Sequence, residues 1–392
     1  MTVPPGFPDG CFGAGHPGAL YEEIRAHGAP VRHPELPLWL VGTYAEVHEA
    51  AADPAAFRSG DGILISEIGH AYDAPPTMMH TDPPDHTRYR RLVAPAFRPK
   101  VMRALEGPVR DRVRALLDAL PAGAPADVVG GLAVPLPLQV ICLLLGVPED
   151  DWPRFHAWSE AIVPGAAEGL DDAERDRLRI ECGTYLVRTA HERRDAPRDD
   201  VISQLATLTA DGDSLTDLEL VMFLIQLLVA GNETTRHAIS GGLHALAAAP
   251  GQWAALRARP AALLDGAVAE ILRWTAPVVY FLRTATRDVT LGGAKIAAGE
   301  RVMLLYGSAN RDPAAYGPDA GRFDIARAPE PAGLAFGFGP HYCLGAALAR
   351  LELRILLEET AARHERLVPA GDPVWNASPL VTGLRRLPLA LS

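Results

Sequence analysis

The chain has 392 residues, of which 48% are hydrophobic and 22% charged, a composition typical of a globular protein and not of a disordered chain or a collagen. Lys and Arg number 37 against 48 Asp and Glu, so the net charge of −11 provides no overall attraction to nucleic acid. The four cysteines are too few and too widely spaced for a disulfide framework or a Cys-x-x-Cys metal site, which indicates a reducing compartment such as the cytoplasm.

Helical patterns dominate the chain, and strands are few and short, which predicts a mainly α fold with a small β region. The first 18 residues are rich in Pro and Gly, and we expect an irregular arm there without a signal peptide or a membrane anchor. The segment 60–84 has little periodicity and predicts a long functional loop. Helices are expected over 20–27, 44–52, 85–97, 101–120, 136–145, 151–162, 172–194, 199–210, 251–258, 261–274 and 345 to about 363, and strands over 31–41, 284–291, 295–296 and 301–305.

The clearest predicted element is a long central helix. Thr216 and Glu219 form the sequence signature of a capping box, and the helical pattern continues to about residue 249. At 1.5 Å per residue this helix is roughly 50 Å long, and because it is apolar on nearly all sides at first, it is expected to cross the middle of the protein. Its most apolar stretch, 220–230, falls short of the roughly 20 residues that span a bilayer, so no membrane association is expected.

The segment 336–345 is rich in glycine and precedes the last long helix. It contains Cys343, whose sulfur is therefore expected at a helix N-terminus, where the helix dipole and free N–H groups favour a thiolate. The alternative is a buried structural cysteine, the usual place of a free thiol. The two glycines and the proline before Cys343 favour a loop that approaches a flat ligand closely.

The sequence F-G-x-G-x-H-x-C-L-G at 336–345 resembles the haem-binding loop of the cytochrome P-450 enzymes. This resemblance implies heme b as the cofactor, with Cys343 as the axial thiolate ligand of its iron. It further implies that His341 bonds a haem propionate, that Phe336 packs beside the sulfur and that the N–H of Gly345 tunes the thiolate. The implied architecture is the cytochrome P-450 fold, a triangular helical prism that forms a single domain over residues 1–392.

The central helix carries the sequence A-G-N-E-T-T-R at 230–236, where an apolar helix presents a small pair, then an acid and an alcohol. One interpretation is a helix end with a new cap at Thr234 or Thr235; however, the helical pattern resumes at once. The segment resembles the oxygen-binding segment of the same family. The resemblance places Ala230 beside the haem and implies that Glu233 and Thr234 relay protons to bound dioxygen.

Two further patterns are weak alone and gain meaning from the resemblance. Glu270 and Arg273 form an E-x-x-R pair, and such pairs are commonly solvated neighbours on one helix face. The resemblance implies instead that they form a buried pair that supports the cysteine loop, with Arg322 as the third partner. The second pattern consists of the basic residues His86, Arg90 and Arg283. On their own they could be solvated surface residues. The resemblance implies that they donate hydrogen bonds to the haem propionates, and Arg suits this role because it pairs with carboxylates through two parallel bonds.

The resemblance implies a monooxygenase that uses dioxygen and two externally supplied electrons to hydroxylate or epoxidise a largely hydrophobic small molecule, foremost a natural-product intermediate. A ferredoxin with its reductase, fed by NAD(P)H, is the expected electron donor, and Arg88 and Arg91 are candidates for its docking face. The alternatives are a steroid or branched-lipid hydroxylase, oxidative coupling, peroxide-driven oxidation and, most remotely, a haem sensor. The apolar candidates for substrate contact are Phe223, Leu227, Val278, Val279, Leu380 and Val381.

Overall fold

A computed structural model of the chain describes residues 7–69, 77–163, 170–209, 212–328, 330–376 and 378–392. The α-helices are α1 (Gly18–Ala26), α2 (Tyr44–Ala52), α3 (Asp85–Val93), α4 (Pro99–Ala119), α5 (Pro135–Leu145), α6 (Trp152–Ile162), α7 (Asp172–Asp195), α8 (Val201–Thr207), α9 (Asp217–Ala248), α10 (Pro250–Ala258), α11 (Pro260–Thr275), α12 (Tyr306–Ala309), α13 (Pro313–Tyr316) and α14 (Ala346–Arg363). Short 3-10 or π turns are η1 (Ile65–Glu67), η2 (Met78–His80), η3 (Ala94–Phe97), η4 (Val129–Ala133), η5 (Glu149–Asp151), η6 (Leu334–Phe336) and η7 (Gly339–His341).

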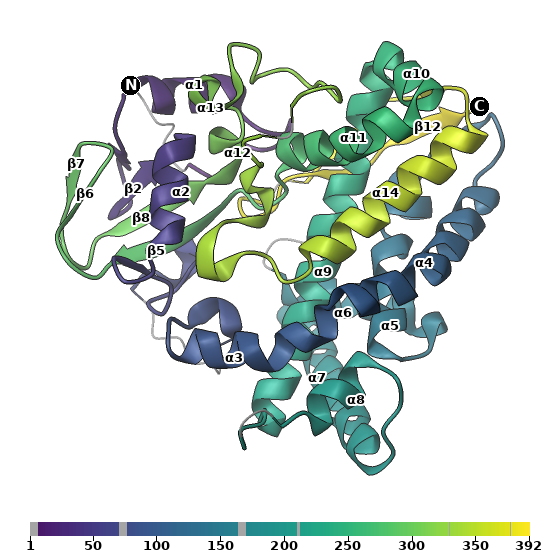
Figure 1. Ribbon diagram of the computed structural model, residues 1–392, viewed down its shortest axis with the longest axis horizontal. Helices are drawn as coiled ribbons and strands as arrows, with labels where there is room; N and C mark the ends of the chain where they lie inside the picture. The colour runs from purple at the N-terminus through teal and green to yellow at the C-terminus, as the bar shows by residue number, and fades with distance from the viewer. Residues whose placement is uncertain (1–6, 70–76, 164–169, 210–211, 329, 377) are drawn as a thin grey trace.

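The strands are β1 (Val31–Arg32), β2 (Leu38–Val41), β3 (Phe57–Arg58), β4 (Pro125–Asp127), β5 (Tyr280–Ala285), β6 (Val289–Leu291), β7 (Ala294–Ile296), β8 (Arg301–Leu305), β9 (Leu367–Pro369), β10 (Val374–Trp375), β11 (Leu384–Arg386) and β12 (Pro388–Leu391). They form small sheets, so helices dominate the described residues, and the predicted mainly α class with a small β region is confirmed. Figure 1 shows a roughly triangular outline with the larger sheet at one corner and most helices on the other side.

The central helix α9 forms as predicted. The Thr216 side chain accepts a hydrogen bond from the N–H of Glu219, and the Glu219 side chain accepts one from the N–H of Thr216, which completes the capping box. Within the described part of the chain, α9 is the one helix long and apolar enough to cross a bilayer, yet it lies in the middle of the molecule and contributes to its largest hydrophobic core (Figure 1). It is therefore the core helix around which the others pack.

The five-stranded sheet has the order β1-β2-β8-β5-β3. Strands β2 and β8 are parallel, with Leu40 opposite Met303, and β5 pairs antiparallel with β8, with Arg283 opposite Val302. Because side chains alternate along a strand, Leu282 packs into the core beneath the sheet whereas Arg283 lines the central cavity. The sheet thereby positions a buried arginine at the site described below.

Several expected element boundaries are wrong. The expected strand 284–291 is two strands, β5 and β6, separated by a bend, and β5 begins earlier, at Tyr280. The expected helix 199–210 is shorter: Asp200 caps it by accepting a hydrogen bond from the N–H of Ser203, and it ends at Thr207. The segment 60–84 contains the short turns η1 and η2, and its residues 70–76 lie outside the described part of the chain.

Candidate active site

The cysteine loop is held in a compact fold by its glycines. Gly337 and Gly339 have φ values of 68° and 71°, in the left-handed region that favours glycine, and a Cβ on Gly339 would lie 2.4 Å from the carbonyl oxygen of Ala51. The N–H of Cys343 donates to the carbonyl oxygen of Phe336 over 2.9 Å, which closes the loop. Helix α14 then begins at Ala346, so Cys343 precedes a helix N-terminus as predicted.

The Cys343 sulfur lies in a positive environment. Burial raises the pKa of the Cys343 thiol, whereas the N–H groups of Gly345 and Ala346 and the guanidinium groups of Arg90 and Arg350 favour the thiolate. Arg90 is fixed nearby, since it donates to the carbonyl oxygen of Tyr342 over 2.6 Å. A metal ion bound to the sulfur would remove the cost of burying this charge, because a coordinated thiol is deprotonated.

Cys343 opens into a large cavity between its own loop and α9. The empty space among its lining residues, including the part open to solvent, is about 1420 Å³. All residues that the sequence assigned to the cofactor line this cavity: His86, Arg90, Ala230, Arg283, Phe336, His341, Cys343 and Gly345. These residues come from segments far apart in the chain, and the fold brings them together around one cavity.

Two arginines and two histidines lie together at one end of the cavity without a carboxylate paired to the arginines. The rings of His86 and His341 lie 4.2 Å apart, and burial together with Arg283, His86 and Arg90 lowers the pKa of His341 to about 2. The buried Nε2 of His86 has no hydrogen-bond partner. Among the described residues, no carboxylate forms an ion pair with Arg90 or Arg283, although Arg283 is only 5% exposed. Uncompensated buried charge is costly, so this end of the cavity is built for anions.

Haem fits both the Cys343 sulfur and the group of arginines and histidines. Its two propionates would supply the anions that His86, Arg90, Arg283 and His341 lack, and its iron would take the Cys343 thiolate. The apolar cavity walls suit the rest of the macrocycle. Among the described residues no cluster of three or more metal-ligating side chains occurs, and haem requires only the one cysteine from the protein.

On the opposite wall, α9 passes through 230–236 without a break. The Thr234 Oγ1 donates to the carbonyl oxygen of Ala230 over 2.7 Å, and Thr234 lines the cavity. Gly231 allows close packing against α5, where a Cβ would lie 2.8 Å from Cδ1 of Ile141 and that side chain would have to shift. The alternative of a helix end at this segment is wrong.

Glu233 does not line the cavity and faces α6. Its Oε2 lies 2.8 Å from Nη2 of Arg236, whose Nη1 in turn donates to Oε1 of Glu160 over 2.8 Å. Burial raises the pKa of Glu233 to about 7, although Arg236 opposes the shift. Among the described hydrogen bonds none joins Glu233 to Thr234, since successive helix residues point about 100° apart.

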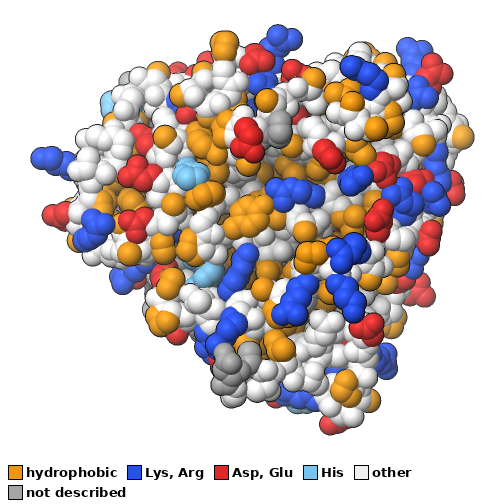
Figure 2. Space-filling view, in the orientation of Figure 1, with side chains coloured by type: hydrophobic (Ala, Val, Ile, Leu, Met, Phe, Trp, Pro, Cys, Tyr) orange, Lys and Arg blue, Asp and Glu red, His pale blue; other side chains and the backbone are white. Residues whose placement is uncertain are grey.

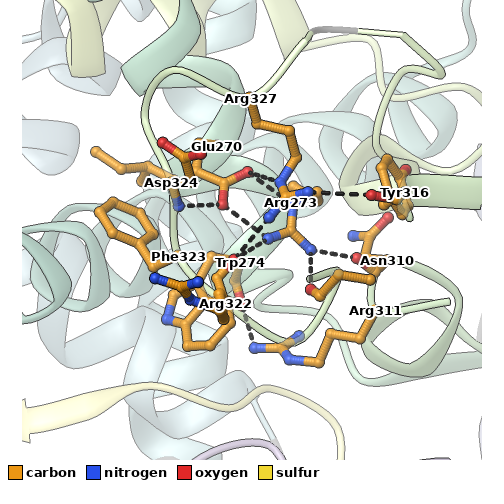
Figure 3. Close-up of polar contacts among 12 residues, drawn as sticks. Glu270, Arg273, Trp274, Asn310, Arg311, Tyr316, Arg322, Phe323, Asp324 and Arg327 are labelled. Carbon is orange, nitrogen blue, oxygen red and sulfur yellow. Dashed lines mark hydrogen bonds and ion pairs between the residues drawn. The ribbon is translucent and has the colours of Figure 1, made fainter. Parts of the chain in front are cut away.

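Glu270 and Arg273 form the buried centre of a polar cluster shown in Figure 3. Arg273 binds both carboxylate oxygens of Glu270 over 2.7 Å and donates to the carbonyl oxygens of Asn310 and Ala320. The Asn310 side chain then accepts from the N–H of Leu334, where the cysteine loop begins. The cluster thus ties α11 to the loop that carries Cys343.

The assignment of Arg322 as third partner is wrong for its side chain. Arg322 contributes only its carbonyl oxygen, which accepts a hydrogen bond from Arg273 over 2.9 Å. The residue itself is exposed. Arg327 supplies the third side chain, with its Nε 3.5 Å from Oε2 of Glu270 (Figure 3). Both arginines lie in an irregular segment, where no helical or strand period indicates which one points inward.

The substrate predictions divide into two groups. Phe223, Leu227 and Val278 line the cavity as expected. Three others do not: Val279 is fully buried in the core beneath the sheet, Leu380 packs against that core, and Val381 is paired with Val278 through the backbone. Sequence reasoning missed the cavity residues Phe97 and Gln226, although a lone glutamine in the most apolar stretch of α9 is a recognisable signal.

Arg88 is engaged elsewhere and is a poor docking candidate. It donates to Asp213 over 2.8 Å and to Glu219 over 2.7 Å, so it fixes the start of α9. Arg91 approaches the same Asp213 at 3.5 Å and is more exposed. Exposed cations lie on α3, on α4 and in the turn before it, and on α14. We call them the basic patch: Arg91, Arg98, Lys100, Arg103, Arg350 and Arg354.

Comparisons with known proteins agree with this site. A family model described as Cytochrome P450 matches residues 260–387, which include the Glu270 cluster and the cysteine loop. The putative cytochrome P450 126 of Mycobacterium tuberculosis is 42% identical over 369 residues, with 90% of this chain and 87% of the relative covered. The chain therefore belongs to the cytochrome P450 family, whose members bind haem.

Other relatives indicate the kind of reaction. The methyl-branched lipid omega-hydroxylase of Mycobacterium tuberculosis is 39% identical over 370 residues, covering 90% of this chain and 84% of that protein. The structure of CYP109E1 from Bacillus megaterium in complex with corticosterone superimposes with a TM-score of 0.86 at 36% identity, covering 96% of this chain and 98% of that one. The protein is thus a P450 monooxygenase of the bacterial type.

Proposed function

We propose that this monooxygenase hydroxylates an extended, largely apolar small molecule of the lipid or steroid kind. The observation that carries the proposal is the apolar wall of the cavity opposite Cys343, formed by Phe223, Leu227, Val278 and Phe281. The named relatives act on a methyl-branched lipid or bind corticosterone, which supports this class over the natural-product intermediate expected first.

Bound haem would supply the iron chemistry that activates dioxygen. The chain's own residues would do the rest. Cys343 would ligate the iron, and the N–H groups of Gly345 and Ala346 would spread the charge of its thiolate. His86, Arg90, Arg283 and His341 orient the macrocycle through its propionates, and the apolar walls exclude water from the reacting carbon.

Protons would reach the site from the α6 side. His156 and Glu160 lie 3.8 Å apart on a partly exposed face, Arg236 joins Glu160 to Glu233, and Thr234 presents its hydroxyl near the cavity wall. Glu233 must turn or act through water to reach Thr234, because the two side chains point in different directions. Glu233 and Thr234 remain our candidates for the last steps of proton transfer.

Electrons would enter through the basic patch. Figure 2 shows Lys and Arg side chains gathered over the face where α14 and the neighbouring α3 and α4 lie. An acidic ferredoxin, itself reduced by a ferredoxin reductase with NAD(P)H, is complementary to this face despite the net negative charge of the chain. We place the protein in the cytoplasm and treat residues 1–392 as one domain around one cofactor.

A ligand screen tests the proposed function. The haem-loaded protein is titrated with steroids, methyl-branched fatty acids, polyketides and peptides, and the spin-state shift of its absorption spectrum is recorded. We expect shifts with the first two classes, and oxygenated product when a surrogate ferredoxin, its reductase, NADPH and dioxygen are added. Shifts only with polyketides or peptides would contradict the substrate class, and product formed only with peroxide would contradict the dioxygen route.

A further inference from the structure

One face of α9 forms the wall of the cavity from its apolar end to the oxygen-binding segment. Phe223, Gln226, Leu227, Ala230 and Thr234 lie at helical spacings of three and four residues, and all of them line the cavity. Within the first two turns of this stripe, Gln226 is the one polar side chain. Its neighbours are a phenylalanine and a leucine, so its amide has no obvious role in packing.

The Gln226 amide is incompletely satisfied. Its Oε1 is shielded from water, and no donor lies within hydrogen-bond distance of it. A buried acceptor without a donor is destabilising, and the end of a glutamine side chain rotates readily. A turn of the amide toward the cavity would allow a bound molecule to supply the missing donor.

The distribution of charge in the cavity indicates which chemical group of a bound molecule could donate to Gln226. The described cationic residues that line it are Arg90 and Arg283, and both lie at the end already assigned to the haem propionates. A substrate carboxylate would therefore find no cation near Gln226, and a neutral amide alone would not offset the cost of removing its charge from water. A neutral hydroxyl, in contrast, donates to Oε1 without desolvating a charge.

We infer that Gln226 is a specificity-determining residue that binds the hydroxyl group of an apolar alcohol. Gln226 lies eight residues before Thr234 on α9, which is about 12 Å along the helix axis. The substrate would thus be oxidised at a carbon remote from its hydroxyl group. This inference rests on the proposed function and narrows its substrate class from lipids in general to extended neutral alcohols.

The test compares three ligands of one chain length in the haem-loaded enzyme: 1-dodecanol, dodecane and dodecanoic acid. Dissociation constants come from the spin-state shift and from calorimetry. In the native protein we expect dodecanol to bind more tightly than the other two. In Gln226→Leu we expect its dissociation constant to rise about five- to tenfold, while that of dodecane changes by less than about twofold.

Two further variants separate hydrogen bonding from packing. Gln226→Glu keeps an acceptor and should retain the preference for dodecanol over dodecane. Leu227→Met alters the neighbouring cavity residue without a polar change and should shift both ligands equally. The inference is overturned if Gln226→Leu leaves the dodecanol-to-dodecane affinity ratio as it is in the native protein. Failure of the proposed function would look different, because then none of the three ligands would shift the spin state of any variant.

Discussion

Arg273→Ala is expected to lower the free energy of unfolding by about 3–5 kcal/mol and to prevent stable haem retention. The variant leaves the buried Glu270 carboxylate with only the longer contact to Arg327 as a cationic partner, and it removes the donors to the carbonyl oxygens of Asn310, Ala320 and Arg322. Since Asn310 holds Leu334 at the start of the cysteine loop, the loop loses its anchor as well. Denaturant unfolding and the haem content after gel filtration measure the two effects.

The matched control is Arg322→Ala. Its side chain is exposed and only its main-chain carbonyl takes part in the cluster, so we expect a change within about 0.5 kcal/mol and full haem content. Arg327→Ala should lie between the two, because its contact with Glu270 is longer, at 3.5 Å. Equal losses for Arg273→Ala and Arg322→Ala would show that the cluster does not hold the loop in the way described.

Glu233→Gln is expected to slow dioxygen-dependent product formation by about 10²-fold, the lower end of general acid–base effects, and to divert electrons to hydrogen peroxide. Substrate binding should not change, because Glu233 faces α6 and does not line the cavity. Coupling is measured as product and peroxide formed per NADPH consumed. Glu174→Gln, an exposed carboxylate on α7, serves as the control and should behave as the native protein; full coupling in Glu233→Gln would contradict the relay.

The pH dependence of turnover and of stability provides a second test of the role of Glu233. Burial raises its pKa from 4.5 to about 7, and the groups that face it are Arg236 and His237 on α9 and Glu160 on α6. A proton donor with this pKa is depleted as the pH rises through 7, so turnover of the native enzyme should fall there. The folded state also binds this proton more tightly than the unfolded state, so stability should decrease as the pH rises from about 4.5 through 7. Both trends should be weaker in Glu233→Gln.

The sequence alone was sufficient to predict the fold class and the capped central helix, and all residues that it assigned to the haem line one cavity. These features depend on local patterns: the Thr216 and Glu219 pair of the cap, and a loop whose glycines at 337 and 339 need left-handed backbone. Such patterns predict structure well because a few neighbouring residues fix the local backbone geometry. The resemblance to the family added the roles of residues far apart along the chain, such as His86 and Arg283, which the fold then brings to one end of one cavity.

What the sequence could not provide is the direction of individual side chains. Adjacent residues in extended backbone point to opposite sides, so Val278 lines the cavity while Val279 is buried in the core beneath the sheet. Glu233 and Thr234 are separated by the helical rotation in the same way. Arg327 replaces Arg322 in the buried cluster because an irregular segment has no period from which its inward side can be read.

The most direct test of the central claim is the absorption spectrum of the reduced, haem-loaded protein with carbon monoxide. The structure places one thiol, Cys343, at the floor of the cavity, within the positive field of Arg90 and Arg350. We expect a strongly red-shifted Soret band that reports thiolate ligation and that is lost in Cys343→Ala. A histidine-type band in the native protein, or an unchanged thiolate band in Cys343→Ala, would contradict the assignment of Cys343 as the ligand.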